Sequence, residues 1–149
     1  MQKIPVKTKE LPAESRNRGF LEVVSGYSQE EAVLEASRCL QCRDPKCISG
    51  CPVGIDIKKF IFQLTQKDFS GAYFTIREKS NFPCICGRVC PAEYQCRKAC
   101  VLTKKGSVFA CAQAINIHFL ERFVGDFGMK NGLKVKNTPD KKVEGMKVA

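Results

Sequence analysis

Eight of the ten cysteines in this 149-residue chain fall into two closely spaced groups. The first group has the spacing C-x2-C-x4-C-x3-C, is followed directly by proline, and consists of Cys39, Cys42, Cys47 and Cys51. The second group has the spacing C-x3-C-x5-C-x3-C and consists of Cys86, Cys90, Cys96 and Cys100. So many thiols at short, loop-like intervals exceed what packing requires, and we expect them to bind an inorganic group.

The donor type and the spacing narrow the choice of that group. Thiolate-rich sites select zinc or iron–sulfur centres. Short repeated intervals that end in Cys-Pro are typical of ferredoxins, in which the fourth cysteine of a run often ligates the other cluster. We therefore predict two 4Fe-4S clusters, with a zinc-binding structural or interaction module as the alternative. His118 is the only histidine, so a His-rich zinc site is excluded and a structural role is expected for it.

The charge balance bears on partners and location. Lys and Arg number 25 against 15 Asp and Glu, a net charge of +10. The basic residues are scattered and accompany no aromatic array, which argues against nucleic acid and favours a basic docking face for an acidic partner subunit, or a solvated surface. The segment from Met1 to Lys7 has no apolar run, so we expect no signal peptide, no membrane span and a cytoplasmic location. Free thiols rather than disulfides follow from that location.

The sequence predicts a mostly α fold in which helices carry the cysteines. Residues 1–13 are polar and predicted to be extended, and an apolar stripe predicts a helix over 16–27. Ser28 and Glu31 have the spacing of a capping box. This box predicts a helix over 30–38 that leads directly into the first cysteine group.

Two further helices are predicted between the cysteine groups. Asp56 can cap the first of them, whose apolar residues recur at helical spacing: Ile57, Phe60, Ile61 and Leu64. The second is predicted over 70–79, with Ala72, Tyr73 and Ile76 facing inward. We expect the two helices to form a hairpin that returns the second cysteine group to the first.

The rest of the chain is predicted to complete one cluster-binding domain over residues 14–128. Pro91 is suited to the first turn of a short helix that carries the last two cysteines. A last helix is predicted over 108–127, with Gly128 able to end it. Residues 129–149 are basic and polar, and are predicted to be a linker.

Four stretches of the chain are similar to one known domain. They are Arg38–Cys42, Asp44–Ile57, Cys86–Pro91 and Leu120–Phe123. Over about residues 15–128 the chain resembles the N-terminal iron–sulfur domain of the glutamate synthase small (β) subunit. The same domain type, a helical two-cluster ferredoxin-like domain (α-helical ferredoxin), occurs in NADH-dependent ferredoxin:NADP oxidoreductase and in dihydropyrimidine dehydrogenase.

This resemblance implies a function in electron transfer within an NADPH-linked flavoprotein. The glutamate synthase small subunit is the expected protein, and the small subunit of NADH-dependent ferredoxin:NADP oxidoreductase is the alternative. In the family, FAD and NADPH domains follow, so we expect a fragment of an oxidoreductase (glutamate synthase (NADPH) type). No GxGxxG or Walker A motif occurs, and no catalytic nucleotide domain is expected in this chain. The implied partners are the flavin domain of the same full-length protein and a large (α) subunit or ferredoxin-type protein.

The resemblance also implies how the ligands are shared between the clusters. It assigns the first cluster to Cys39, Cys42, Cys47 and Cys100. It assigns the second cluster to Cys51, Cys90, Cys96 and Glu121. The stretch between Gly106 and Glu121 is longer than expected and contains Cys111. Cys86 and Cys111 therefore remain alternatives to Glu121. By composition alone, Cys84 and Cys111 are expected to be small buried apolar residues.

Overall fold

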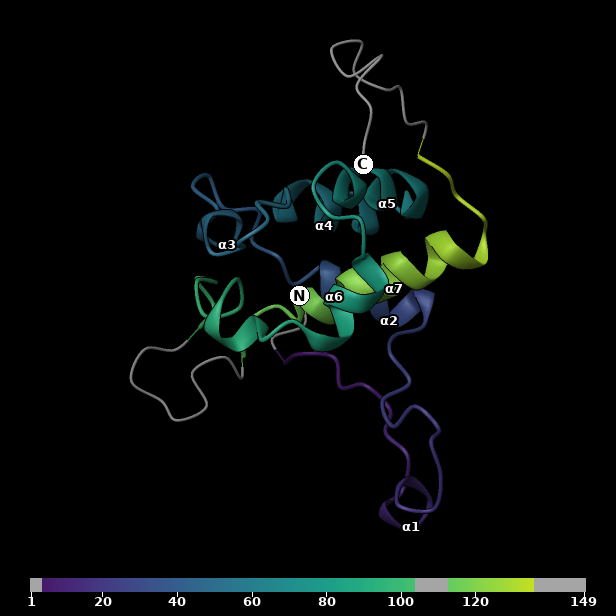
Figure 1. Ribbon diagram of the computed structural model, residues 1–149. Helices are drawn as coiled ribbons and strands as arrows, with labels where there is room; N and C mark the ends of the chain where they lie inside the picture. Colours follow the sequence, from purple (N-terminus) through teal and green to yellow (C-terminus); the bar gives the residue numbers. More distant parts are fainter. Residues whose placement is uncertain (1–3, 104–112, 136–149) are drawn as a thin grey trace, which may run out of the picture.

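The computed structural model describes residues 4–103 and 113–135, and within these ranges the fold is helical with no sheet (Figure 1). The elements in chain order are α1 Ala13–Arg16, α2 Gln29–Ala36, α3 Lys46–Ser49, α4 Ile57–Thr65, α5 Phe69–Arg77, α6 Pro83–Val89, the 3₁₀ helix η1 Ala92–Tyr94, and α7 Ile117–Lys130. The prediction of a mostly α fold is confirmed. None of the helices in the described ranges is long and apolar enough to cross a membrane.

The core lies where α7 meets α2, α5 and α6, and where the α4–α5 hairpin covers α2 (Figure 1). Its fully buried apolar side chains include Phe60, Ile61, Leu64, Ile76, Leu120 and Val124. Each such side chain contributes about 1.5–3 kcal/mol through removal from water. The predicted hairpin between the cysteine groups and its inward-facing residues are confirmed.

Side-chain caps fix where the helices begin. The amide of Glu31 donates to Ser28 Oγ at 3.2 Å, and the amide of Ser28 donates to Glu31 Oε2 at 2.8 Å. This confirms the predicted capping box. Asp56 Oδ1 accepts from the amide of Lys59 at 3.0 Å, so the predicted cap of α4 is also confirmed. Asp68 caps α5 in the same way, which the sequence analysis did not identify.

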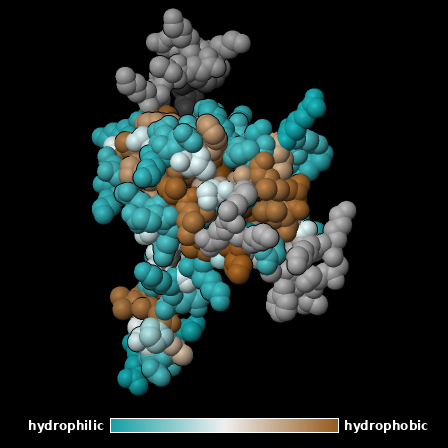
Figure 2. Space-filling view, turned by 180° about the vertical axis from the view of Figure 1, so that it is seen from behind, coloured by the Kyte–Doolittle hydropathy of each residue, from teal (hydrophilic) through white to brown (hydrophobic). Residues whose placement is uncertain are grey.

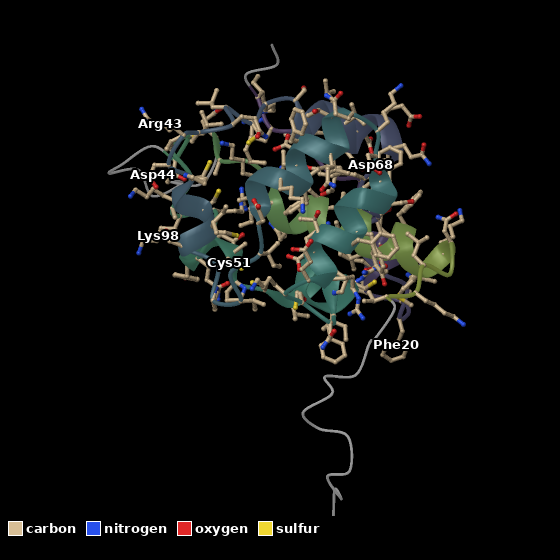
Figure 3. All side chains as sticks on the ribbon, turned by 90° about the horizontal axis from the view of Figure 1, so that it is seen from above. Phe20, Arg43, Asp44, Cys51, Asp68 and Lys98 are labelled. Atoms are coloured by element: carbon tan, nitrogen blue, oxygen red, sulfur yellow. The ribbon has the colours of Figure 1, made fainter. Side chains whose placement is uncertain are left out.

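The helix predicted over 16–27 is wrong. Helix α1 ends at Arg16, and the chain then forms a projecting arm whose Phe20 is fully exposed (Figures 1 and 3). The arm is closed at its base by an isolated bridge between Glu10 and Val24. A short amphipathic helix needs a surface on which to bury its apolar face, and the arm lies away from the body of the molecule.

The predictions for the last helix were wrong at both ends. Helix α7 starts at Ile117 rather than 108, and the described residues from Gln113 to Asn116 precede it; residues 104–112 lie outside the described ranges. Gly128 does not end the helix, which continues to Lys130. A Cβ atom at Gly128 would stand 2.2 Å from the ring of Tyr73, so glycine is needed there for close packing rather than for termination.

The short helix predicted after Pro91 is also shorter than expected. Only Ala92–Tyr94 form a 3₁₀ turn, and Gln95 leaves it with φ −122° and ψ −117°. Cys96 and Cys100 therefore lie in turns rather than on a helix. Backbone bonds within those turns, such as the amide of Cys100 to the carbonyl of Arg97 at 3.1 Å, hold the segment in place of helical bonds.

Candidate metal centre

Three cysteines of the first group and the last cysteine of the second line one pocket. They are Cys39, Cys42, Cys47 and Cys100. The other walls of the pocket are largely apolar, with Leu40, Ile57, Ile61, Val101 and Ile117 among them. Four thiols surrounded by aliphatic side chains form a soft, water-poor donor set, which fits a metal–sulfur centre.

Local backbone geometry brings these four thiols together. Gln41 has φ 50°, a left-handed turn between two cysteines, and its Nε2 lies 3.5 Å from Cys39 Sγ. The single turn of α3 carries Cys47 and ends at Gly50. A Cβ atom at Gly50 would stand 2.8 Å from Ala99 Cβ, so glycine lets the end of α3 meet the turn that carries Cys100.

The charges of these thiols are coupled. Burial raises the pKa of Cys39, and it raises that of Cys47 to about 11. In both cases a thiolate at Cys100 would add to the increase by repulsion. The thiols of Cys39 and Cys47 are therefore protonated at neutral pH in the absence of positive charge, and metal binding must displace those protons.

A second set of donors gathers around Cys96. Burial raises the pKa of Cys96 to about 12, and repulsion from Cys51, Cys90 and Glu121 adds to the increase. The pKa of Cys90 is also raised, by burial first and then by Glu121, Cys86 and Cys51. One cysteine of the first group thus lies among cysteines of the second group, beside a carboxylate from α7.

Glu121 has the environment expected of a ligand rather than of a surface carboxylate. Its side chain is 8% exposed, and burial raises its pKa to about 7. Its Oε1 atom is buried and has no hydrogen-bond partner among the described residues. A buried polar atom left unpaired costs about 1–3 kcal/mol. A carboxylate oxygen of this kind, close to the thiols of Cys90 and Cys96, fits a position beside a metal cluster.

The alternatives for the eighth donor have different surroundings. Cys86 lies near Cys90, and its Sγ is 3.9 Å from Ser80 Oγ. Cys111 lies outside the described residues. Cys84 belongs to neither set: it is half-buried, and its Sγ is 3.0 Å from Met129 Sδ.

Two further observations bear on the kind of centre. The ring of His118 packs on Phe119 with 4.1 Å between centroids, and burial lowers its pKa to about 4, which agrees with the expected structural role. In the described part of the chain, no three His, Cys, Asp or Glu side chains converge as they would around a single metal ion. The ligands of a four-iron cluster stand farther apart, because each binds a different corner of the inorganic core.

The sequence analysis missed the element that positions the second set. Helix α6 carries Cys86 and leads into Cys90, and it packs along α7 next to Glu121. Phe82-Pro83 was the available signal, because proline is favoured at the first position of a helix. Arg88 on α6 was also missed; it donates to Glu22 at 2.6 Å and to Asp126 at 2.8 Å.

Comparison with known proteins finds a sequence profile that covers most of the chain. Residues 16–133 match the sequence profile described as dihydropyrimidine dehydrogenase domain II, 4Fe-4S cluster. The NAD-dependent dihydropyrimidine dehydrogenase subunit PreT of Escherichia coli (strain K12) is 38% identical over 114 residues, which are 76% of this chain and 26% of that protein. The glutamate synthase [NADPH] small chain of Azospirillum brasilense is 30% identical over 142 residues, 95% of this chain and 28% of that protein.

These matches cover most of this chain but only a small part of each relative. The chain spans about a quarter of the length of the curated relatives it matches. Within the chain, however, the matching profile covers every described cysteine and Glu121. The chain therefore belongs to the family of dihydropyrimidine dehydrogenase domain II, and it is a 4Fe-4S electron-transfer domain.

Proposed function

We propose that this domain holds two 4Fe-4S clusters and relays electrons between a flavin domain of the full-length protein and a partner subunit. The observation that carries the proposal is the division of the donors into two sets, each of which draws on both cysteine groups. When bound, each cluster supplies a site that accepts and releases one electron at a time. The proposal includes a cytoplasmic location, where thiols stay reduced and available.

The protein's own residues would set how the relay works. The first set is proposed to be Cys39, Cys42, Cys47 and Cys100. The second is proposed to be Cys51, Cys90, Cys96 and Glu121. Because each cluster would be bound by residues of both cysteine groups, cluster binding would contribute directly to the free energy of folding. The aliphatic walls of the first pocket limit water, and a carboxylate in the second set gives that centre a different donor strength.

Metal content is the direct test. Protein prepared without oxygen should contain about eight irons per chain, from two four-iron clusters. The solution should be brown and absorb near 400 nm. Two zinc ions per chain and no iron would support the alternative of a zinc-binding structural or interaction module and would contradict the proposal.

Ligand substitutions test the assignment within the two sets. Cys100→Ala should remove the electron paramagnetic resonance signal of the first cluster only, and Cys51→Ala that of the second only. Glu121→Ala should alter the second signal and leave the first intact, and Glu121→Cys should restore a four-iron centre. Cys84→Ala is the control, because Cys84 belongs to neither set. If Cys86→Ala or Cys111→Ala removes a signal while Glu121→Ala changes none, the carboxylate assignment is wrong.

The parent enzyme is a finer part of the proposal. We propose an NADPH-linked oxidoreductase of the glutamate synthase small-subunit type, because that match extends over 95% of the chain. The second candidate is an oxidoreductase of the dihydropyrimidine dehydrogenase subunit type, which is favoured by its higher identity to this chain. In two chimeras, this chain would replace the matching quarter of each relative. The chimera that restores pyridine-nucleotide-dependent electron delivery to its partner subunit identifies the parent type. If only the chimera with the dihydropyrimidine dehydrogenase subunit restores it, the glutamate synthase assignment is wrong.

A further inference from the structure

The pocket of the first donor set opens onto a basic surface. Four cationic residues line this pocket or are next in the chain to a residue that lines it, and we call them the basic rim: Arg43, Lys46, Lys58 and Lys98. Lys46 and Lys58 line the pocket itself. Arg43 follows the pocket cysteine Cys42, and Lys98 precedes the lining residue Ala99. In Figure 3, Arg43 and Lys98 lie on the same side of the molecule and point outward, opposite Asp68.

Most of this positive charge is not neutralised within the fold. Asp44 lies among the rim residues and pairs with Lys46 at 2.6 Å. No ion pair within the described ranges involves the side chains of Arg43, Lys58 or Lys98. The rim therefore presents a local excess of positive charge beside the thiols of the first set.

Apolar side chains lie inside the basic rim. Leu40 is 52% exposed and Val101 is 56% exposed, and both line the pocket. Figure 2 shows that apolar surface gathers on the body of the molecule and is bordered by hydrophilic surface. An apolar centre with a charged border is the usual composition of a protein–protein interface.

The end that carries the second set has a different character. Helix α6 and its N-cap residue expose an apolar stripe at helical spacing: Phe82, Ile85 and Val89. Its cation, Arg88, is neutralised by Glu22 and Asp126. The cation of the helix that carries the second set is thus neutralised, whereas three of the four cations of the basic rim have no ion pair within the described ranges.

We propose that the basic rim is the docking surface of an acidic redox protein, which exchanges one electron with the chain through the first donor set. This inference rests on the proposed two-cluster function. Opposite charges steer two proteins into contact and raise the association rate, by 10-fold to 1000-fold in favourable cases. Leu40 and Val101 would then supply the apolar contact that brings the partner's redox centre close to the pocket.

The test uses the full, iron-loaded chain and plastocyanin, an acidic blue-copper protein, as the probe. After reduction of the chain, one electron passes to Cu(II) and gives Cu(I), with no proton transferred. The variant carries both Arg43→Glu and Lys98→Glu. The rate of electron transfer from the reduced chain to plastocyanin is followed by the copper absorbance in a stopped-flow instrument. At low salt we expect a decrease of about tenfold, which should shrink as salt screens the charges.

A matched control separates the rim from net charge. Lys67→Glu with Lys134→Glu changes the net charge by the same amount, and Lys67 adjoins Asp68, at the opposite end from the rim in Figure 3. The control pair should slow electron transfer less than about threefold. Equal effects of the two pairs would show that only net charge matters, and they would overturn the proposal.

A second readout needs no electron transfer. The Cu(I) form of plastocyanin accepts no electron, and its affinity for the chain can be measured by calorimetric titration at low salt. The dissociation constant should rise about tenfold for the rim pair alone. An unchanged dissociation constant in a chain with full iron content overturns this inference and leaves the two-cluster function standing. A folded chain that takes up no iron overturns both.

Discussion

Gly87 on α6 and Arg122 on α7 lie in direct backbone contact. A Cβ atom at Gly87 would stand 2.5 Å from both the Cα and the amide nitrogen of Arg122. A second close approach follows one turn along, where a Cβ atom at Gly125 would stand 2.7 Å from the amide nitrogen of Cys84. These two glycines let α6 and α7 pack at backbone distance, and so they hold Cys86 and the adjoining donors beside Glu121.

Gly87→Ala should therefore damage the second donor set through helix separation. The added methyl group meets backbone, which cannot move aside cheaply, and overpacking of this kind costs about 1–3 kcal/mol. We expect a lower urea midpoint, and loss of the second cluster's paramagnetic signal before the first. Gly19→Ala is the matched control, because nothing lies within 4 Å of its Cβ position. Equal midpoints for the two variants would contradict the packing argument.

Helix caps and close glycine contacts differ in how far they can be predicted from the sequence. Local signals predicted correctly the caps at Ser28 and Asp56, where a side chain acts on the backbone of its own helix, although the same kind of cap at Asp68 was missed. The role of Gly128 depends on Tyr73, 55 residues away along the chain, and no local pattern contains that contact. Helix α6 was missed for a similar reason. It has only seven residues and is stabilised chiefly by its packing on α7, which is distant in the sequence.

The candidate donors had direct signals in the sequence. The cysteine spacing indicates them, and the resemblance to a known domain supplies their division into two sets, which stays a prediction. The projecting arm had no comparable signal: Phe20 and Val24 have helical spacing, but the structure leaves Phe20 fully exposed. Apolar periodicity predicts a helix only where another element is present to cover it.

Arg88 should hold the projecting arm against the body of the molecule. It pairs with Glu22 at the base of the arm and with Asp126 on α7. Because these side chains are partly exposed, the pairs are worth only about 1 kcal/mol. We expect Arg88→Gln to accelerate amide hydrogen exchange at Leu11 and Ser25, whose amides bond across the base of the arm. The comparison is with substitution of an exposed cation in the arm itself.

Arg16→Gln supplies that comparison. Arg16 lies 3.9 Å from Glu10 and both side chains are exposed, so the pair should contribute almost nothing. Exchange at Leu11 and Ser25 should stay unchanged in this variant. If Arg16→Gln accelerates exchange as much as Arg88→Gln does, the arm is held by general charge attraction rather than by Arg88.

Glu35 should be the most sensitive polar residue of the core. It is fully buried, and it accepts from the amide of Val6 at 2.8 Å, the amide of Asn116 at 2.9 Å and Arg38 Nη1 at 2.5 Å. Glu35→Ala leaves a buried cation and two buried amides without this partner, and we expect a loss of about 3–5 kcal/mol in urea unfolding. Glu35→Gln retains acceptor oxygen and should lose clearly less.

A half-buried glutamate in the same helix serves as the reference. Glu31→Ala removes one half of the capping box and should cost only about 1 kcal/mol. A loss for Glu35→Ala no larger than this would mean that the buried network is compensated elsewhere and is not the link between the N-terminal segment, α2 and α7.

His118 should make the stability of the domain fall at mildly acidic pH. Burial lowers its pKa to about 4, below the ordinary value of 6.5, so the unfolded chain binds a proton before the folded chain does. The contribution is complete above pH 6.5 and is lost as the pH falls towards 4. Between pH 8 and pH 6 we expect the wild type to lose about 1 kcal/mol more than His118→Gln. Every other titrating group is common to both chains, so urea unfolding at the two pH values isolates this residue. Parallel losses in the two proteins would show that the His118 ring is not held neutral by the fold.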